Sequence, residues 1–121
     1  TLLYIYDTPS FNPFSLAVDT TGELFFSDDS TGSIFQIEPN NHTTVYSGQG
    51  KLNGLAADAA NLYWITASGT NYEILRGPKA GGSPTSLYKG TELYSFSPRD
   101  LKLQGGFVYW VADDTIWRIA Q

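Results

Sequence analysis

An internal repeat of about 40 residues is the feature that most constrains the fold of this chain. Two apolar segments, Thr44–Gly48 and Ser86–Gly90, each carry a tyrosine two residues before a closing glycine, and their tyrosines lie 42 residues apart. Counting back another 42 residues leads to Tyr4, inside the similar segment Leu2–Tyr6. We therefore expect the chain to begin part-way through a repeat and to stop at the matching point.

Each repeat also carries three earlier segments, which recur in the same order. They are short, rich in aromatic and β-branched residues, and separated by glycine-containing turns, as β-strands are. None has a sustained helical period. The first type occurs at Pro13–Asp19, Leu52–Asp58 and Pro98–Gln104, the second at Leu24–Ser27, Leu62–Ile65 and Val108–Val111, and the third at Ile34–Ile37, Ile74–Arg76 and Ile116–Ile119.

A period of about 40 residues with four short strands is typical of a β-propeller blade. The predicted fold class is all-β, with three four-stranded blades in one domain of 121 residues. The repeats cover approximately residues 7–48, 49–90, and 91–121 together with 1–6. A β-sandwich with coincidental spacing is the alternative. A hydrophobic content of 41%, with 15% aromatic residues, is enough for a packed core.

Charge and short motifs limit the partners. The net charge is −5 without a basic patch, so we expect no nucleic acid partner. No apolar run is long enough to span a membrane. The triplet Asn41-His42-Thr43, at a predicted polar turn between repeats, is an N-glycosylation acceptor pattern at Asn41 and favours a secreted or extracellular protein. The chain lacks an initial Met, so it is either a mature product or an excised piece.

One pair of segments carries a family resemblance. Leu52–Ala56 followed by Leu62–Thr66 resembles the Pro-x-Gly-Leu-Ala-Val-Asp and Leu-Tyr-Trp-Thr-Asp pattern of YWTD and NHL-like six-bladed propellers. Looser copies occur at Pro13–Asp19 with Leu24–Asp28, and at Val108–Trp110. The resemblance covers essentially the whole chain and is specific for fold rather than for function. The departures are Ser15 and Asp100 in place of Gly, and Gln104 in place of Asp.

The resemblance implies how the blades are arranged. The first strand of each blade would line a central channel and the fourth would form the outer rim. Aromatic side chains such as Phe26, Trp64 and Trp110 would then fill the gaps between blades. An aromatic sugar-binding shelf is the alternative, with Trp117 as its best candidate, although Phe35 and Leu75 occupy equivalent places and favour core packing.

Three blades cannot close a ring, and an open arc would expose two blade faces and a strand edge. Repeat arrays need their terminal faces covered. We therefore expect a homodimer that forms a six-bladed ring by strand exchange, with Leu2–Tyr6 of one copy beside Ile116–Ile119 of the other. A longer parent protein and a three-chain ring of nine blades are the alternatives. Six is the usual blade number in the resembling family.

Catalytic and metal signatures are sparse. The chain has no cysteine and one histidine, His42, which excludes a Cys or His metal cluster and an ordinary Ser-His-Asp triad. We expect no catalytic residues and no cofactor. Two aspartate pairs follow second strands and are weak Ca²⁺ candidates, because Ca²⁺ needs six to eight oxygen ligands. The alternative is a solvated turn in which aspartate accepts from backbone N–H groups. The pairs are Asp28 with Asp29 and Asp113 with Asp114.

The entries to the first strands, Phe14, Asn53 and Arg99, are predicted to lie at the channel mouth. Asn53-Gly54 also resembles the Asn-Gly motif of calcium-dependent gluconolactonase-like hydrolases, where that Asn is a metal ligand. That family holds its metal with a Glu, two Asn and an Asp from different blades. Here Asn53 alone matches, while Phe14 and Arg99 argue against a full metal shell.

The third repeat carries an unusual charged cluster, Arg99, Asp100 and Lys102. Charged groups on an innermost strand are costly unless they are paired or wet. Asp100 and Lys102 are two residues apart and are expected to share a face. They would form either a mutual ion pair beside channel water or an anion-tolerant site. The other repeats carry small residues at these places, Ser15 and Ala17, and Gly54 and Ala56.

These patterns favour a non-enzymatic β-propeller module that binds or serves as a scaffold. It would assemble with itself into a closed ring and recognise a protein, peptide or glycan at one face or at the channel mouth. A calcium-dependent gluconolactonase-like hydrolase on the same ring is the alternative. The sequence offers no clear acidic partner for Asn53 in the channel, which favours the binding module.

Overall fold

The computed structural model describes residues 11–39, 41–92 and 98–121, and every regular element in these ranges is a β-strand. The strands form three antiparallel sheets in chain order, which we call blades 1, 2 and 3. Blade 1 contains β1 (Pro13–Val18), β2 (Leu24–Asp28), β3 (Ser33–Glu38) and β4 (Asn41–Tyr46). Blade 2 contains β5 (Lys51–Ala57), β6 (Asn61–Ser68), β7 (Asn71–Pro78) and β8 (Thr85–Thr91). Blade 3 contains β9 (Arg99–Gln104), β10 (Phe107–Ala112) and β11 (Thr115–Ala120).

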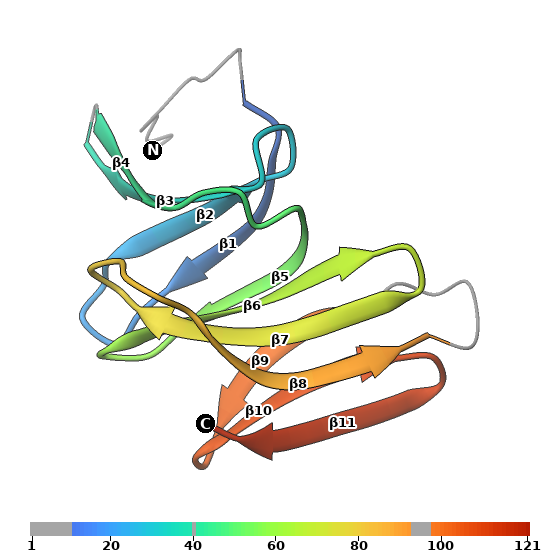
Figure 1. Ribbon diagram of the computed structural model, residues 1–121. Helices are drawn as coiled ribbons and strands as arrows, with labels where there is room; N and C mark the ends of the chain where they lie inside the picture. Colours follow the sequence, from blue (N-terminus) through green and yellow to red (C-terminus); the bar gives the residue numbers. More distant parts are fainter. Residues whose placement is uncertain (1–10, 40, 93–97) are drawn as a thin grey trace, which may run out of the picture.

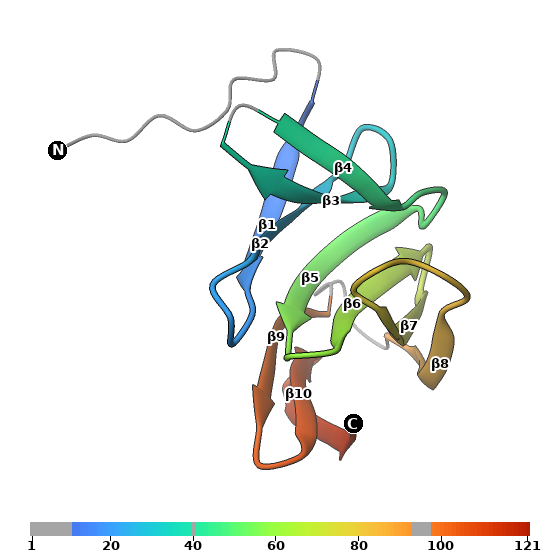
Figure 2. The same ribbon diagram turned by 90° about the vertical axis from the view of Figure 1, so that its left-hand side faces the viewer.

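The blades follow one another around their first strands. Figures 1 and 2 show β5 between β1 and β9, with the later strands of each blade directed away from this inner row. The predicted all-β fold and the order of strands are therefore confirmed. The expected fourth strand of the last blade, Leu2–Tyr6, lies outside the described residues. No helix in the described ranges is long and apolar enough to cross a membrane.

The predicted interblade packing of tryptophan is confirmed. Trp64 is fully buried between blades 1 and 2, and the Tyr46 ring of β4 lies 4.7 Å from it. Trp110 is buried between blades 2 and 3, and the Tyr88 ring of β8 lies 5.3 Å from it. Tyr46 and Tyr88, whose spacing indicates the repeat, therefore have the same role, since each covers the tryptophan of the next blade.

Two blade faces have no blade against them among the described residues. Phe25 packs toward blade 2, so its neighbour Phe26 points the other way and stacks on Phe35 at 5.1 Å. Leu16, in register with Phe26, is 63% exposed. The open face of blade 1 is made by the exposed Leu16 and Val18 and by Phe26 and Phe35, which are buried because the Phe11 ring packs over them at 6.1 and 4.9 Å.

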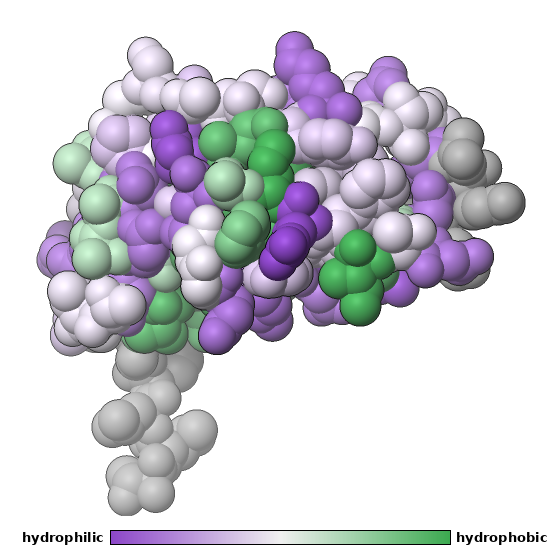
Figure 3. Space-filling model, turned by 90° about the horizontal axis from the view of Figure 1, so that it is seen from below, coloured by the Kyte–Doolittle hydropathy of each residue, from purple (hydrophilic) through white to green (hydrophobic). Residues whose placement is uncertain are grey.

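The other uncovered surface belongs to blade 3. Trp110 packs toward blade 2, so the neighbouring Tyr109 and Val111 point outward. Ile116, in register with Val111, is 75% exposed. Figure 3, seen from below Figure 1, shows hydrophobic residues set among hydrophilic ones on this side of the molecule. The open face of blade 3 is made by Tyr109, Val111, Ile116 and Arg118.

Two aromatic expectations need comment. Trp117 is 38% exposed and lies at the edge of the core, 6.1 Å from Tyr88 and 6.4 Å from Trp110, so it packs on the aromatic residues between blades 2 and 3 and keeps part of its ring open to solvent. The placement of Asn41-His42-Thr43 in a turn between repeats is wrong, because these residues begin β4. The His42 ring lies edge-on to Phe35 at 5.2 Å and holds this segment against blade 1. Asn41 is exposed, and its glycosylation stays a prediction.

Candidate binding site at the channel mouth

The five side chains predicted at the channel mouth line one hollow. Its volume is about 260 Å³, and its walls come from the starts of β1, β5 and β9. The polar members come from different blades, so the site exists only because the first strands of successive blades are neighbours. The predicted residues that the fold brings together here are Phe14, Asn53, Arg99, Asp100 and Lys102.

A β-bulge shapes the start of each first strand. The register shifts between Pro13 and Ser15 in β1 and between Leu52 and Gly54 in β5, so Phe14 and Asn53 are the extra residues. In β9 the shift comes one residue later, opposite Trp110. Bulges redirect a side chain and often occur beside functional sites. They place Phe14 and Asn53 at the hollow.

Asn53 is the most unusual residue of the hollow. Its side chain is 7% exposed, and neither the amide Oδ1 nor the amide Nδ2 has a hydrogen-bond partner. A buried polar group without a partner costs about 1–3 kcal/mol. Gly54 holds the strand close, since a Cβ there would lie 3.2 Å from Leu101 Cβ. The mouth therefore contains a fixed donor and acceptor that the described chain does not satisfy.

The expected ion pair between Asp100 and Lys102 is wrong. No such contact joins them, and both residues are exposed. The reason is the backbone of Asp100, whose φ is 59°, together with the bulge in β9. These features break the alternation that would put residues two apart on one face. Lys102 instead lies in register with Tyr109 of β10.

Lys102 also reaches a second hollow further along the inner wall. This hollow, of about 260 Å³, is lined by the later halves of β1, β5 and β9. Of its described lining residues, Lys102 alone is charged, and the others are Leu, Ala and Val. Lys102 is therefore the charged residue among those described on this part of the wall, immediately beside the mouth.

Asp28 accepts hydrogen bonds from the turn that follows β2, as the alternative to a metal ligand predicts, but it is fully buried rather than solvated. Its carboxylate accepts from Asn12 N at 2.6 Å, Ser30 Oγ at 2.8 Å and Thr31 N at 3.1 Å. Burial alone would raise the pKa of Asp28, but these hydrogen bonds outweigh it and hold the pKa below its usual value. Its oxygens are therefore already occupied in organising the loop after β2.

The other aspartates do not assemble a metal site. Asp29 Oδ1 is buried without a partner, Asp113 has a φ of 53°, and Asp114 is exposed. Within the described ranges, no three His, Cys, Asp or Glu side chains gather as a metal site would require. At the mouth, Asp100 is the acidic residue among those described, and no glutamate accompanies Asn53. The calcium shell of the hydrolase motif is not assembled from these residues.

Comparisons with known proteins decide the type of fold. No family profile and no curated protein matches the chain. A chain in the crystal structure of a nidogen/laminin complex superposes with a TM-score of 0.78 at 19% identity, covering 93% of this chain and 45% of that one. The fold is that of a β-propeller.

A second solved structure has a related architecture. The PQQ-bound aldose sugar dehydrogenase from Streptomyces coelicolor superposes with a TM-score of 0.58 at 20% identity, covering 74% of this chain and 34% of that one. This β-propeller chain thus spans less than half the length of either structure. At such identities the likeness concerns the fold, and the mouth residues must be judged on their own geometry.

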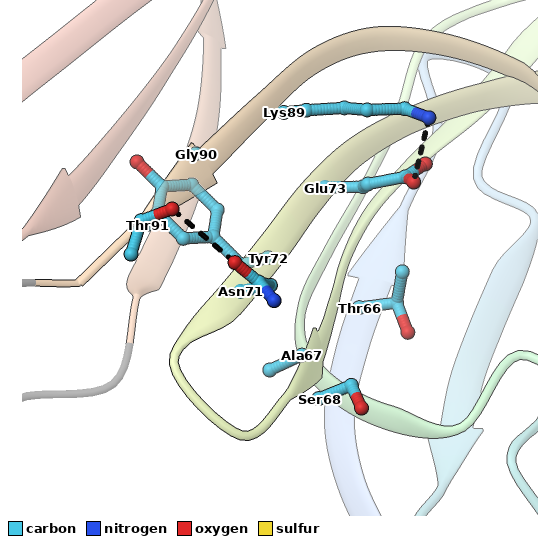
Figure 4. Close-up of a pocket in the computed structure, with 9 residues that line it drawn as sticks. All are labelled: Thr66, Ala67, Ser68, Asn71, Tyr72, Glu73, Lys89, Gly90 and Thr91. Atoms are coloured by element: carbon cyan, nitrogen blue, oxygen red, sulfur yellow. Dashed lines mark hydrogen bonds and ion pairs between the residues drawn. The ribbon is translucent and has the colours of Figure 1, made fainter.

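A further hollow on blade 2 was not predicted from the sequence. Figure 4 shows this space of about 290 Å³ at the β6–β7 hairpin. Its polar side chains are already paired, because Lys89 Nζ lies 3.4 Å from Glu73 Oε1 and Thr91 Oγ1 donates to Asn71 Oδ1 at 3.2 Å. The sequence contained one signal for this hollow, the opposite charges of Glu73 and Lys89, which face each other on neighbouring strands. With its polar groups satisfied, this hollow is a weaker site than the mouth.

Proposed function

We propose that this β-propeller is a non-enzymatic binding module that holds a protein or peptide ligand at its channel mouth. The observation that carries the proposal is Asn53, whose buried amide offers an unused donor and an unused acceptor. A residue in an extended peptide presents its own N–H and C=O on one side, and a carboxamide likewise presents a donor beside an acceptor. A glycan, which also has hydroxyl donors and acceptors, is the other ligand class. The nidogen/laminin neighbour, a complex between proteins, supports a protein ligand.

We also propose that a second copy of the chain closes the ring. On the open face of blade 1, Phe26 and Phe35 occupy the places that Trp110 and Trp117 have in blade 3, and Phe11 of the same chain packs over them. The open face of blade 3 presents Tyr109 where blade 2 presents Tyr63 to blade 3. The two open faces therefore repeat the two halves of an interface that the chain already forms internally.

The edge of blade 3 supports the same assembly. In the described residues β11 has no strand on its outer side, whereas β3 and β7 pair with β4 and β8. An unpaired strand edge readily accepts another strand. Leu2–Tyr6 from a second copy is the segment that we propose for this place. Two such contacts would make an obligate interface of more than about 2,000 Å² in total.

Ligand binding at the mouth is tested by Asn53→Leu, which keeps the branched shape of the side chain and removes both polar groups. A displayed library of random peptides is selected on the wild-type protein, and enriched peptides are measured by calorimetry. The variant should bind them at least about tenfold more weakly, the equivalent of about 1.4 kcal/mol. Thr91→Ala in the blade 2 hollow is the matched control and should bind normally. Peptides that bind Asn53→Leu as tightly as wild type would contradict the proposal.

Ring closure is tested by the mass in solution. Light scattering at micromolar concentration should give twice the mass of the chain. Leu16→Lys, which puts a charge on the open face of blade 1, should shift the protein toward monomer, whereas Lys51→Glu away from that face should not. Deleting residues 1–6 should expose the edge of β11 and cause aggregation. A wild-type monomer, or a truncated chain that stays soluble and dimeric, would refute closure by strand exchange.

A further inference from the structure

The mouth carries a cation, Lys102, that has no ion-pair partner among the residues that the structure describes. Lys102 lines both hollows of the inner wall, so its side chain is common to the polar mouth and to the apolar wall behind it. No carboxylate in the described part of the chain lies within ion-pair distance of its ammonium. Its nearest acidic neighbour in sequence, Asp100, has its backbone turned into the left-handed region and does not pair with it.

Lys102 also differs from the residues at the equivalent position of the other two repeats. Ala17 and Ala56 occupy the equivalent positions, in register with Phe25 and Tyr63 as Lys102 is with Tyr109. Ala17 is 7% exposed and belongs to the core between blades. Lys102 is exposed, so a lysine at this position gives up the packing of the alanine row and presents a charge to the channel.

Lys102 is exposed, so its ammonium is open to an incoming carboxylate. The other residues that line the second hollow are leucine, alanine and valine, which offer no competing charge. The chain as a whole carries a net charge of −5, so long-range attraction does not concentrate anions here. Recognition of an anion must therefore come from local contacts at the mouth, where Lys102 supplies a charge that has no ion-pair partner in the described residues.

We propose that the ligand held at the mouth is an acidic peptide, whose peptide group bonds Asn53 and whose carboxylate pairs with Lys102. This inference rests on the binding function proposed above. Asn53 and Lys102 line the same hollow of about 260 Å³, which places the two contacts within one short segment of ligand. The lysine makes the site selective, because an uncharged peptide would satisfy Asn53 and leave the ammonium without a partner.

Two displayed libraries of random peptides test the inference, one containing Asp and Glu and one with Asn and Gln in their place. The wild-type protein should enrich peptides with an acidic residue at a fixed position. Lys102→Ala, which restores the residue of the other repeats, should weaken these peptides at least about tenfold. Lys102→Arg should keep most of the affinity. Lys51→Ala removes a cation at the same end of the molecule, outside the mouth, and should change nothing.

The outcomes separate the two proposals. If the neutral library yields peptides that need Asn53 but bind Lys102→Ala as well as wild type, the binding function stands and the acidic ligand is refuted. If acidic peptides are enriched but Asn53→Leu binds them normally, Lys102 acts without the proposed mouth contact, and the joint site is refuted. If neither library yields a peptide, both proposals fail.

Discussion

Lys79, which follows β7 in blade 2, forms an ion pair with Asp19, which follows β1 in blade 1. The same ammonium lies 2.7 Å from Glu23 Oε2. The Asp19 carboxylate is fixed within its own turn, because Thr21 N donates to Oδ1 at 2.8 Å and Glu23 N donates at 2.9 Å. One aspartate therefore closes the turn after a first strand and also ties that blade to the next.

The second repeat uses its aspartate in the same way. Asp58 accepts from Ala60 N at 2.8 Å and Asn61 N at 2.7 Å, and Gln121 Nε2 donates to it from blade 3 at 3.0 Å. Gln121 follows β11 as Lys79 follows β7. We call these two contacts, Asp19 with Lys79 and Asp58 with Gln121, the interblade latches.

The latches have no equivalent pair at the two open faces. Gln104 stands in the third repeat where Asp19 and Asp58 stand in the others, and Pro39 follows β3 at the place of Lys79 and Gln121. A ring closed by a second copy would bring Gln104 and Pro39 together. The joints between copies would then depend on apolar packing and strand pairing.

The first prediction concerns the latches. Asp58→Asn should lower the free energy of unfolding, because the amide cannot accept from both backbone N–H groups and Gln121 as a carboxylate does. Asp19→Asn should do the same through the loss of the ion pair with Lys79. Urea denaturation measures both. Asp114→Asn, an exposed change of the same kind, is the control, and an equal loss of stability there would contradict the assignment.

The second prediction concerns acid. Burial alone would raise the pKa of Asp58, but hydrogen bonds from Ala60, Asn61 and Tyr63 outweigh it and lower the pKa. A carboxyl with a lowered folded pKa stabilises the protein above its unfolded pKa, which is about 3.9, and loses this contribution as the pH falls toward the folded value. The free energy of unfolding should therefore decline below about pH 4. Asp58→Asn should decline less steeply, and parallel curves would show that Asp58 is not responsible.

The strand order was predictable because it follows from local pattern. Residues that alternate on a strand must point to opposite faces, and each turn carries glycine or polar residues. The spacing of Tyr46 and Tyr88 was a signal of tertiary packing as well, since each ring covers the tryptophan of the following blade. Because the sequence repeats, the packing between blades 1 and 2 predicts the packing between blades 2 and 3.

The chemistry of the mouth was only partly predictable. The sequence placed Asn53 and Lys102 near each other, because both belong to first strands. It did not show that Asn53 lacks a partner, since burial and satisfaction depend on the bulge in β5. The sequence also gave a wrong ion pair between Asp100 and Lys102, because a hydropathy pattern does not reveal that the backbone φ of Asp100 is positive. The latch between Asp19 and Lys79 was missed for a similar reason, as it joins residues 60 apart.

The third prediction concerns the close approach of Tyr46 to Gly77. Tyr46 Oη donates to Pro78 O at 2.7 Å, and a Cβ on Gly77 would lie 2.3 Å from that hydroxyl oxygen. Gly77→Ala should therefore push the ring out of place and cost about 1–3 kcal/mol by overpacking. Tyr46→Phe should cost about 1 kcal/mol through the lost hydrogen bond. Thermal melts of the two variants should show the larger fall for Gly77→Ala, and the reverse order would refute the contact.

The fourth prediction concerns the backbone of Asp100. Its φ of 59° is unfavourable for a residue with a Cβ, though less so for aspartate than for alanine. Asp100→Ala should cost about 1 kcal/mol, whereas Asp100→Gly should be close to neutral. Lys102→Ala should change stability by less than about 0.5 kcal/mol, as for an exposed side chain without a partner. If Asp100→Gly is as damaging as Asp100→Ala, the side chain rather than the backbone matters at this position.

The fifth prediction concerns Asn53 in the absence of any ligand. Its amide groups are buried without partners, so Asn53→Leu should raise the free energy of unfolding by about 1–2 kcal/mol. Ser27→Ala is the opposite case, because the buried Ser27 Oγ accepts from Ser15 N at 3.0 Å and its loss leaves that donor unsatisfied. Urea denaturation should therefore move the two variants in opposite directions. A loss of stability in Asn53→Leu would show that Asn53 supports the fold. A gain in the free energy of unfolding of Asn53→Leu, together with weaker peptide binding, is expected if Asn53 serves ligand binding rather than folding.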